Sequence, residues 1–116
     1  MLRPEGKVRV YLYVDPVDMR KSIDGLSALV EQEMDLSPMN EALFVFCNRS
    51  RDKVKILCWE RNGFIVWYKR LEKQRFRWPK AGDTLQLSGQ ALNWLLDGFD
   101  IFHNQPHKAV SFDTVS

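Results

Sequence analysis

The sequence predicts an α+β domain in which an antiparallel β-meander of three to five strands packs against two helices. Apolar, β-branched runs separated by turn residues follow one another through the middle of the chain. Segments near residues 18–33 and 88–97 carry apolar residues at helical spacing. A length of 116 residues with 45% hydrophobic residues suits one core. We therefore expect a single domain over residues 1–102 and a loosely ordered, polar tail over 103–116.

The first two elements expected are a strand and a helix. Val8–Val14 is rich in β-branched and aromatic residues and ends before Asp15-Pro16, which is typical of a strand. Asp18 is the predicted N-cap of a helix that runs to about Glu33. Its apolar residues step by four, three and four and so form one stripe: Met19, Ile23, Leu26 and Val30.

The middle of the chain predicts a three-stranded meander. Its strands are Leu43–Cys47, Lys53–Trp59 and Phe64–Arg70. Asn62-Gly63 favours a tight hairpin because both residues accept positive φ. Alternation in the second strand places Val54, Ile56 and Cys58 on one face, opposite Lys53, Lys55, Leu57 and Trp59. We expect the sheet to bury one face against the helices, with the basic residues on the other face or in the turns.

The C-terminal third contains one segment without a predicted structure, Leu71–Pro79. Thr84–Leu87 is predicted as a short strand. Ser88 is the predicted cap of a final helix that extends to Asp97, and Gly98 is a suitable stop for it.

No catalytic or metal-binding group is evident in the sequence. His103 and His107 are separated by Pro106, which disfavours the helix that would align them, and no third ligand is evident. The acidic residues are scattered, and there is no glycine-rich phosphate loop and no nucleophile–base set. We expect a non-catalytic protein without a cofactor or metal.

Cysteine usage and hydropathy indicate a cytoplasmic protein. Cys47 and Cys58 lie in apolar runs, so two buried thiols are favoured over a disulfide. No apolar run approaches the roughly 20 residues needed to cross a bilayer. The N-terminus lacks the apolar core of a secretory signal, so no membrane association is expected.

Charge is distributed unevenly along the chain. The overall net charge is +2, but Arg49–Lys80 alone has eleven basic and three acidic residues and carries +8. The rest of the chain carries −6. Such a separation concerns partners more than fold, and it favours an anionic partner, which can be DNA or an acidic protein.

Three blocks supply candidate binding residues. The segment 67–79 interleaves cations with aromatic residues, which either stack on bases or serve as core anchors (Trp67, Phe76 and Trp78). Residues 18–22 place two cations at a predicted helix N-terminus, which either grips an anion or is an ordinary solvated surface. The turn 48–53 carries two arginines that can reach phosphates. The candidate nucleic-acid-binding residues are Arg20, Lys21, Arg49, Arg51, Lys53, Lys69, Arg70, Lys73, Arg75 and Arg77.

Together these blocks resemble one known family. The stretches Asp18–Leu26, Leu43–Lys53, Gly63–Glu72 and Arg75–Pro79 are similar to the small accessory protein, called TnpB or Orf2-like, of insertion sequence 66 elements. The likeness runs from about Lys7 to Asp100. It implies a bacterial transposable element as the setting and a separate transposase as the neighbouring gene product.

Two hypotheses follow from the residues and the resemblance. In the first, the protein is a DNA-binding accessory factor that contacts element ends or target DNA and assists the transposase. In the second, it is a protein adaptor that docks the transposase without touching DNA. The sequence gives no access to the oligomeric state or to a DNA sequence preference.

Overall fold

The computed structural model describes residues 8–80 and 84–102. In chain order its elements are β1 (Arg9–Leu12), α1 (Ile23–Gln32), β2 (Ala42–Cys47), β3 (Lys53–Glu60), β4 (Gly63–Arg70), β5 (Leu85–Leu87) and α2 (Gly89–Leu96). The predicted tail, 103–116, lies outside the described residues.

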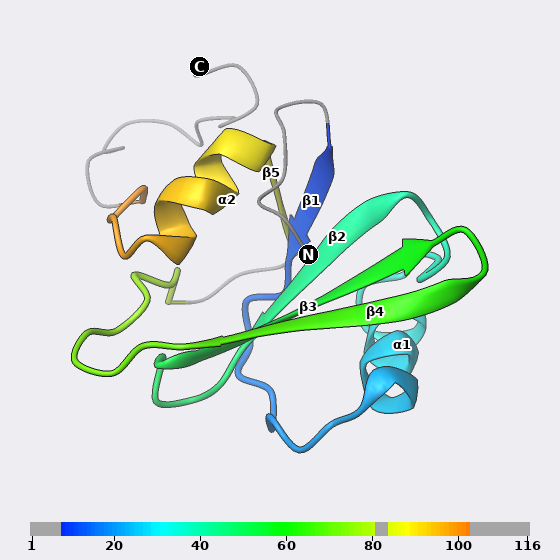
Figure 1. The fold of residues 1–116 in the computed structure, drawn as a ribbon, viewed down its shortest axis with the longest axis horizontal. Coiled ribbons are helices and arrows are strands. Elements are labelled where there is room, and N and C mark those ends of the chain that lie inside the picture. The colour runs from blue at the N-terminus through cyan, green and yellow to red at the C-terminus, as the bar shows by residue number, and fades with distance from the viewer. Residues whose placement is uncertain (1–7, 81–83, 103–116) are drawn as a thin grey trace.

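The five strands form one sheet in the order β4-β3-β2-β1-β5 (Figure 1). The β2–β3, β3–β4 and β1–β5 pairs are antiparallel, which confirms the predicted α+β class and the central meander. β1 and β2, in contrast, are parallel. Parallel neighbours need a crossover connection, and α1 lies within the one that joins them.

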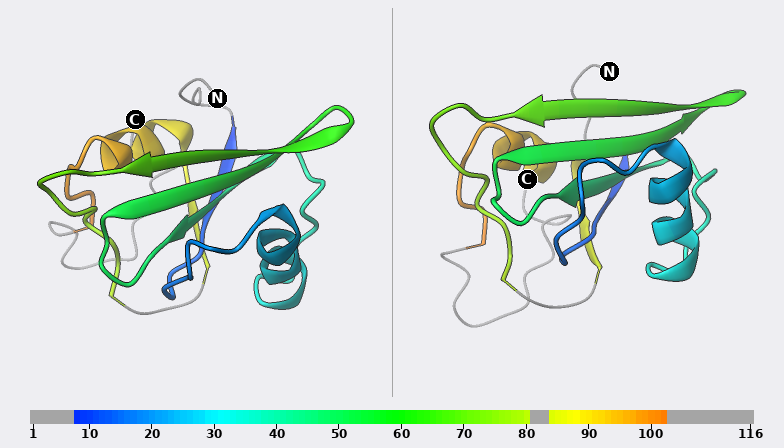
Figure 2. Two further views of the ribbon diagram at one scale, coloured as in Figure 1. Left: turned by 60° about the horizontal axis from the view of Figure 1, so that its bottom comes forward. Right: turned by 90° about the horizontal axis from the view of Figure 1, so that it is seen from below.

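The two helices cover opposite faces of the sheet (Figure 2). α2 packs with Leu92, Leu95 and Leu96 over a cluster that includes Val45 and Ile56. On the other face, Leu26 and Val30 of α1 pack over a second set of sheet residues, which comprises Phe44, Phe46 and Leu57. Of the two predicted locations for the basic residues, the free sheet face is therefore wrong, and the turns remain.

The sequence of β2 explains why both faces are covered. All six of its residues, Ala-Leu-Phe-Val-Phe-Cys, are buried, and none of them is polar. A strand that alternates between apolar and polar residues can leave one face in water, whereas a continuous apolar run must be covered on both. The predicted alternation in β3 is confirmed, since Val54 and Ile56 join the α2 cluster and Leu57 joins the α1 cluster.

α2 forms as predicted. The Ser88 hydroxyl accepts a hydrogen bond from the Ala91 N–H at 3.0 Å, which is the interaction expected of an N-cap. After the helix, Gly98 has φ +92°, its N–H donates to Leu95 O, and the Phe99 N–H donates to Trp94 O. This pair of bonds is a Schellman motif, in which glycine is favoured because it tolerates positive φ.

The predicted start of α1 is wrong by four residues. The helix begins at Ile23 with Ser22 as its N-cap, and Asp18 instead closes a local turn. The Asp18 carboxylate accepts a hydrogen bond from the Arg20 N–H at 2.8 Å, and its backbone carbonyl accepts one from the Lys21 N–H at 3.1 Å. Aspartate satisfies nearby N–H groups equally well in such a turn and at a helix start, so the sequence does not distinguish the two.

Two further details correct or confirm the sequence analysis. In the β3–β4 hairpin, Glu60 pairs with Gly63, and positive φ occurs at Arg61 (56°) rather than at Asn62 or Gly63. Both cysteines are free thiols, and Cys47 is buried while Cys58 is partly buried.

Within the two described stretches of chain, no helix has the length and apolar character of a membrane span.

Candidate nucleic-acid interface

The sheet topology brings the basic segments to one end of the strands. β1 and β2 finish there, β3 begins there and β4 finishes there. The connecting loops 15–22, 48–52 and 71–80 therefore converge, as Figure 1 shows. We call this region the basic end, and define it as these three loops together with the adjoining strand residues Lys53, Lys69 and Arg70. All ten candidate binding residues lie in it.

Asn48 fixes the shape of the β2–β3 turn. Its side-chain oxygen accepts hydrogen bonds from the backbone N–H groups of Asp52 (3.1 Å) and Lys53 (3.0 Å). Its side-chain nitrogen donates to the Asp52 carboxylate at 2.7 Å. That bond is the main cause of a lowered pKa at Asp52, with a further contribution from Lys53. The turn therefore presents its remaining side chains from a fixed backbone.

The same turn is bonded to the loop that follows β4. The Leu71 N–H donates to Asp52 O at 2.8 Å, and the Phe76 N–H donates to Arg51 O at 2.7 Å. On the other side, the Val17 N–H donates to Cys47 O at 2.9 Å. The three loops of the basic end thus form one connected surface rather than three independent segments.

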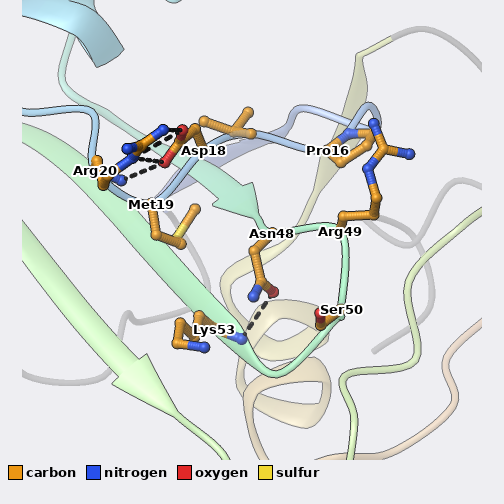
Figure 3. A pocket seen from close by; sticks show the side chains of 9 residues that line it. Pro16, Asp18, Met19, Arg20, Asn48, Arg49, Ser50 and Lys53 are labelled. Carbon is orange, nitrogen blue, oxygen red and sulfur yellow. Dashed lines mark hydrogen bonds and ion pairs between the residues drawn. The ribbon is translucent and has the colours of Figure 1, made fainter.

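An open hollow lies between the first loop and the turn, as Figure 3 shows. Its volume is about 500 Å³, and its cationic lining residues are Arg20, Arg49 and Lys53. Asp18 also lines it and binds the Arg20 guanidinium, with the closest contact at 2.7 Å. This ion pair lowers the pKa of Asp18 to about 2 and raises that of Arg20. Arg49 and Lys53 therefore supply the net positive charge of this hollow. We call it the Arg49 hollow.

Arg20 and Lys21 do not lie in the first turn of a helix but just before it, so their predicted placement is wrong. Both side chains are exposed in the loop before α1. Lys55, which the sequence analysis did not single out, holds this loop in place. Its ammonium donates to the carbonyls of Met19 (2.7 Å) and Lys21 (3.1 Å). The sequence feature that could have indicated this role is a lysine in the middle of a predicted strand, flanked by the apolar residues Val54 and Ile56.

Lys69 and Arg70 lie at the end of β4 and point to opposite faces of the sheet. The Lys69 ammonium donates to Leu96 O at 2.7 Å, at the C-terminus of α2. A cation there complements the helix dipole, so Lys69 has a structural role. Arg70 pairs with Glu72 at 2.8 Å, which raises the pKa of Arg70, and its strand partner is Lys53.

The loop after β4 alternates between outward cations and inward aromatic rings. Lys73, Arg75 and Arg77 are exposed, whereas Phe76 and Trp78 are 2% and 9% exposed. The Trp78 indole N–H donates to Val14 O at 3.0 Å. Trp67 is also partly buried in the α2 cluster. These rings are core anchors, so the alternative in which they stack on bases is wrong for Phe76 and Trp78.

Comparison with known proteins identifies the chain. The family described as IS66 Orf2-like protein matches residues 8–106. The chain belongs to this family. This chain is accordingly a transposition-associated accessory protein, as the resemblance implied.

Two relatives of the IS66 Orf2-like protein come from Sinorhizobium fredii (strain NBRC 101917 / NGR234). The uncharacterized protein y4hO is 36% identical over 104 residues, which cover 88% of this chain and 90% of the relative. The uncharacterized protein y4jC is 31% identical over 101 residues, which cover 86% of each chain. No solved structure matches the IS66 Orf2-like protein.

In the described part of the IS66 Orf2-like protein, no three His, Cys, Asp or Glu side chains are grouped closely enough to hold a metal ion. His103 and His107 lie outside that part. The feature that the geometry does present is a surface of cations on three connected loops. Four of the ten candidates form ion pairs or donate hydrogen bonds to a backbone carbonyl within the protein, namely Arg20, Lys53, Lys69 and Arg70, and Arg51 contacts the Trp78 ring.

Proposed function

We propose that this IS66 Orf2-like protein binds DNA through its basic end and thereby assists the transposase, without catalysing a reaction itself. The observation that carries the proposal is the set of exposed cations on two of the connected loops: Arg49, Lys73, Arg75 and Arg77. None of the four forms an ion pair within the described residues. Unpaired surface cations bind DNA by displacing counterions from its phosphates.

The proposal predicts a steep salt dependence of binding. If about five phosphates are neutralised, the affinity for duplex DNA falls between about 50 and 200 mM salt with a log–log slope of about −4 to −5. Fluorescence anisotropy with element-end and random duplexes would measure this slope. Absence of binding to either duplex at low salt would remove the DNA-binding role.

A matched pair of variants tests the location of the interface. Arg75→Gln removes an exposed cation of the basic end, whereas Arg61→Gln removes one from the β3–β4 turn at the opposite end of the strands. We expect Arg75→Gln to make the slope shallower by about 1, because one phosphate contact is lost, and Arg61→Gln to leave it unchanged. Equal effects would argue against an interface at the basic end.

The adaptor hypothesis predicts a different result from the same proteins. The transposase would co-purify with this protein after nuclease treatment, and the Arg75→Gln substitution would not alter DNA affinity. Nicking of DNA by the purified protein in the presence of Mg²⁺ would contradict the non-catalytic role.

A further inference from the structure

Arg51 differs from Arg49 in the direction that its side chain takes from the same turn. Its backbone has φ +63°, and its carbonyl is held by the Phe76 N–H at 2.7 Å. Its guanidinium carbon lies 6.0 Å from the centre of the Trp78 ring. The Arg51 side chain is half-buried, while that of Arg49 is exposed. The turn therefore directs one arginine into solvent and the other toward the loop after β4.

The buried part of Arg51 lacks a hydrogen-bond acceptor. Its Nη1 atom is shielded from solvent and has no hydrogen-bond partner among the described residues, although the guanidinium does interact with the Cys47 thiol. A guanidinium stays charged at all ordinary pH values, so it cannot escape this cost by losing a proton. A buried donor of this kind, left unpaired, destabilises the folded protein.

The groups around Arg51 do not supply a counter-charge that is free. Burial raises the pKa of the neighbouring Cys47 thiol to about 11, so this group is uncharged at neutral pH although the Arg51 guanidinium lowers its pKa. The Asp52 carboxylate is engaged by Asn48 and Lys53. Neither Cys47 nor Asp52 therefore neutralises the Arg51 guanidinium fully.

Arg51 opens onto a second hollow, distinct from the Arg49 hollow. Its volume is about 410 Å³, and it is lined by Arg51, Phe76, Arg77, Trp78, Lys80 and Asp100. Three of these six residues are cations, and one is a carboxylate. Of the two aromatic residues, Trp78 contacts the charge, since its ring centre is 6.0 Å from the guanidinium carbon of Arg51.

We infer that this Arg51 hollow is a binding site for one phosphate group. A phosphate offers several charged oxygens to a planar guanidinium and to two further cations, and arginine binds such a group with two parallel hydrogen bonds. The group can belong to the DNA backbone, which rests on the proposed function, or to free phosphate. The Asp100 carboxylate, which also lines the hollow, disfavours any anion there, but the three cations outnumber it.

The test uses inorganic phosphate as the probe and the indole N–H resonance of Trp78 as the reporter. That N–H is held in one place by Val14 O, and its NMR signal is assigned by a Trp78→Phe variant. Phosphate is titrated into the full chain against sodium chloride at matched ionic strength. We expect a saturable shift with phosphate and no saturable shift with chloride.

Three substitutions locate the response. Arg77→Gln, at an exposed position, is expected to weaken phosphate binding about tenfold, as loss of a charged hydrogen bond would. Arg51→Lys keeps the charge but removes the bidentate geometry of the guanidinium, and is expected to weaken phosphate binding to a similar extent. Arg49→Gln, on the same turn but in the other hollow, is expected to leave it unchanged. Amide spectra confirm that each variant remains folded.

The outcomes separate this inference from the proposed function. A phosphate shift at Trp78 that Arg77→Gln weakens supports the site whether or not duplex DNA binds. If the shift also disappears on saturation with duplex DNA, the DNA backbone occupies the site. No saturable shift, or equal weakening by Arg49→Gln and Arg77→Gln, overturns the inference, even if DNA still binds to the basic end.

Discussion

At the scale of single residues, Asn48 has the largest influence on the candidate interface although it carries no charge. Three hydrogen bonds of its side chain define the turn from which Arg49 and Arg51 diverge. The sequence identified the turn and its cations. It did not identify the asparagine, because an Asn in a charged turn is common and its bonds depend on the exact backbone path.

The first prediction concerns this asparagine. Asn48→Ala removes three strong side-chain hydrogen bonds and a weak one from the Cys47 thiol, all of a half-buried group, and is expected to lower the free energy of unfolding by about 2 kcal/mol. Ser50→Ala, at an exposed position in the same turn, is expected to change it by less than about 0.5 kcal/mol. Urea denaturation followed by circular dichroism would measure both. Similar losses in the two variants would contradict the role of Asn48.

A second prediction concerns Cys47. Its raised pKa and complete burial leave almost no accessible thiolate near neutral pH. Iodoacetamide at about pH 8 is therefore expected to modify Cys47 slowly in the folded protein and rapidly in urea. Mass spectrometry of peptides gives the rates, with Cys58, which is partly exposed, as the internal comparison. Modification of Cys47 as fast as Cys58 would show that the core opens readily.

At the scale of elements, the sequence predicted the central strands and α2 better than α1. The central strands are marked by β-branched runs between turns, and α2 is marked by Ser88 at its start and Gly98 after its end. These are local features of the sequence, so predicting them required no tertiary information. Where α1 begins depends on a competition between the Asp18 turn and helix extension. The parallel pairing of β1 with β2 depends on contacts distant in sequence, which a local pattern does not contain.

The two helices differ in how their N-termini are capped, so the same substitution is expected to affect stability differently at each. The Ser88 hydroxyl accepts the Ala91 N–H, whereas the Ser22 side chain forms no capping hydrogen bond. Ser88→Ala is therefore expected to reduce stability by about 1 kcal/mol, and Ser22→Ala by less than about 0.5 kcal/mol. Thermal unfolding of the two variants would check this. Equal shifts in the midpoint would indicate that capping at Ser88 contributes little.

At the scale of the whole molecule, charge is segregated along the strands. Acidic residues gather where α1 ends, β2 begins and β3 ends, among them Glu31, Glu33, Glu41 and Glu60. The sequence predicted the charge excess but assigned it to a sheet face or turns. The fold confirms the turns and excludes a free face, because helices cover both faces and the basic turns and loops lie at one end of the strands.

This separation leads to a prediction about the acidic end. β3 and β4 have eight residues each and hold the two ends about 25 Å apart. The screening length at physiological salt is about 8 Å, so charges at the acidic end act weakly on DNA at the basic end. Replacing Glu31, Glu33 and Glu41 by glutamine is expected to change DNA affinity less than about twofold. A larger gain would place DNA near that end.

The position of β1 has a consequence for how the protein is made. β1 is the first strand to be synthesised, yet it lies between β2 and β5 and pairs with Leu85–Leu87 near the other end of the described chain. A nascent chain that has emerged only as far as β4 leaves one side of β1 without hydrogen-bond partners, and such an edge invites pairing with other chains. The chain must therefore emerge from the ribosome as far as Leu87 before this sheet can close, so we expect premature termination after β4 to yield an aggregating fragment rather than a smaller folded unit.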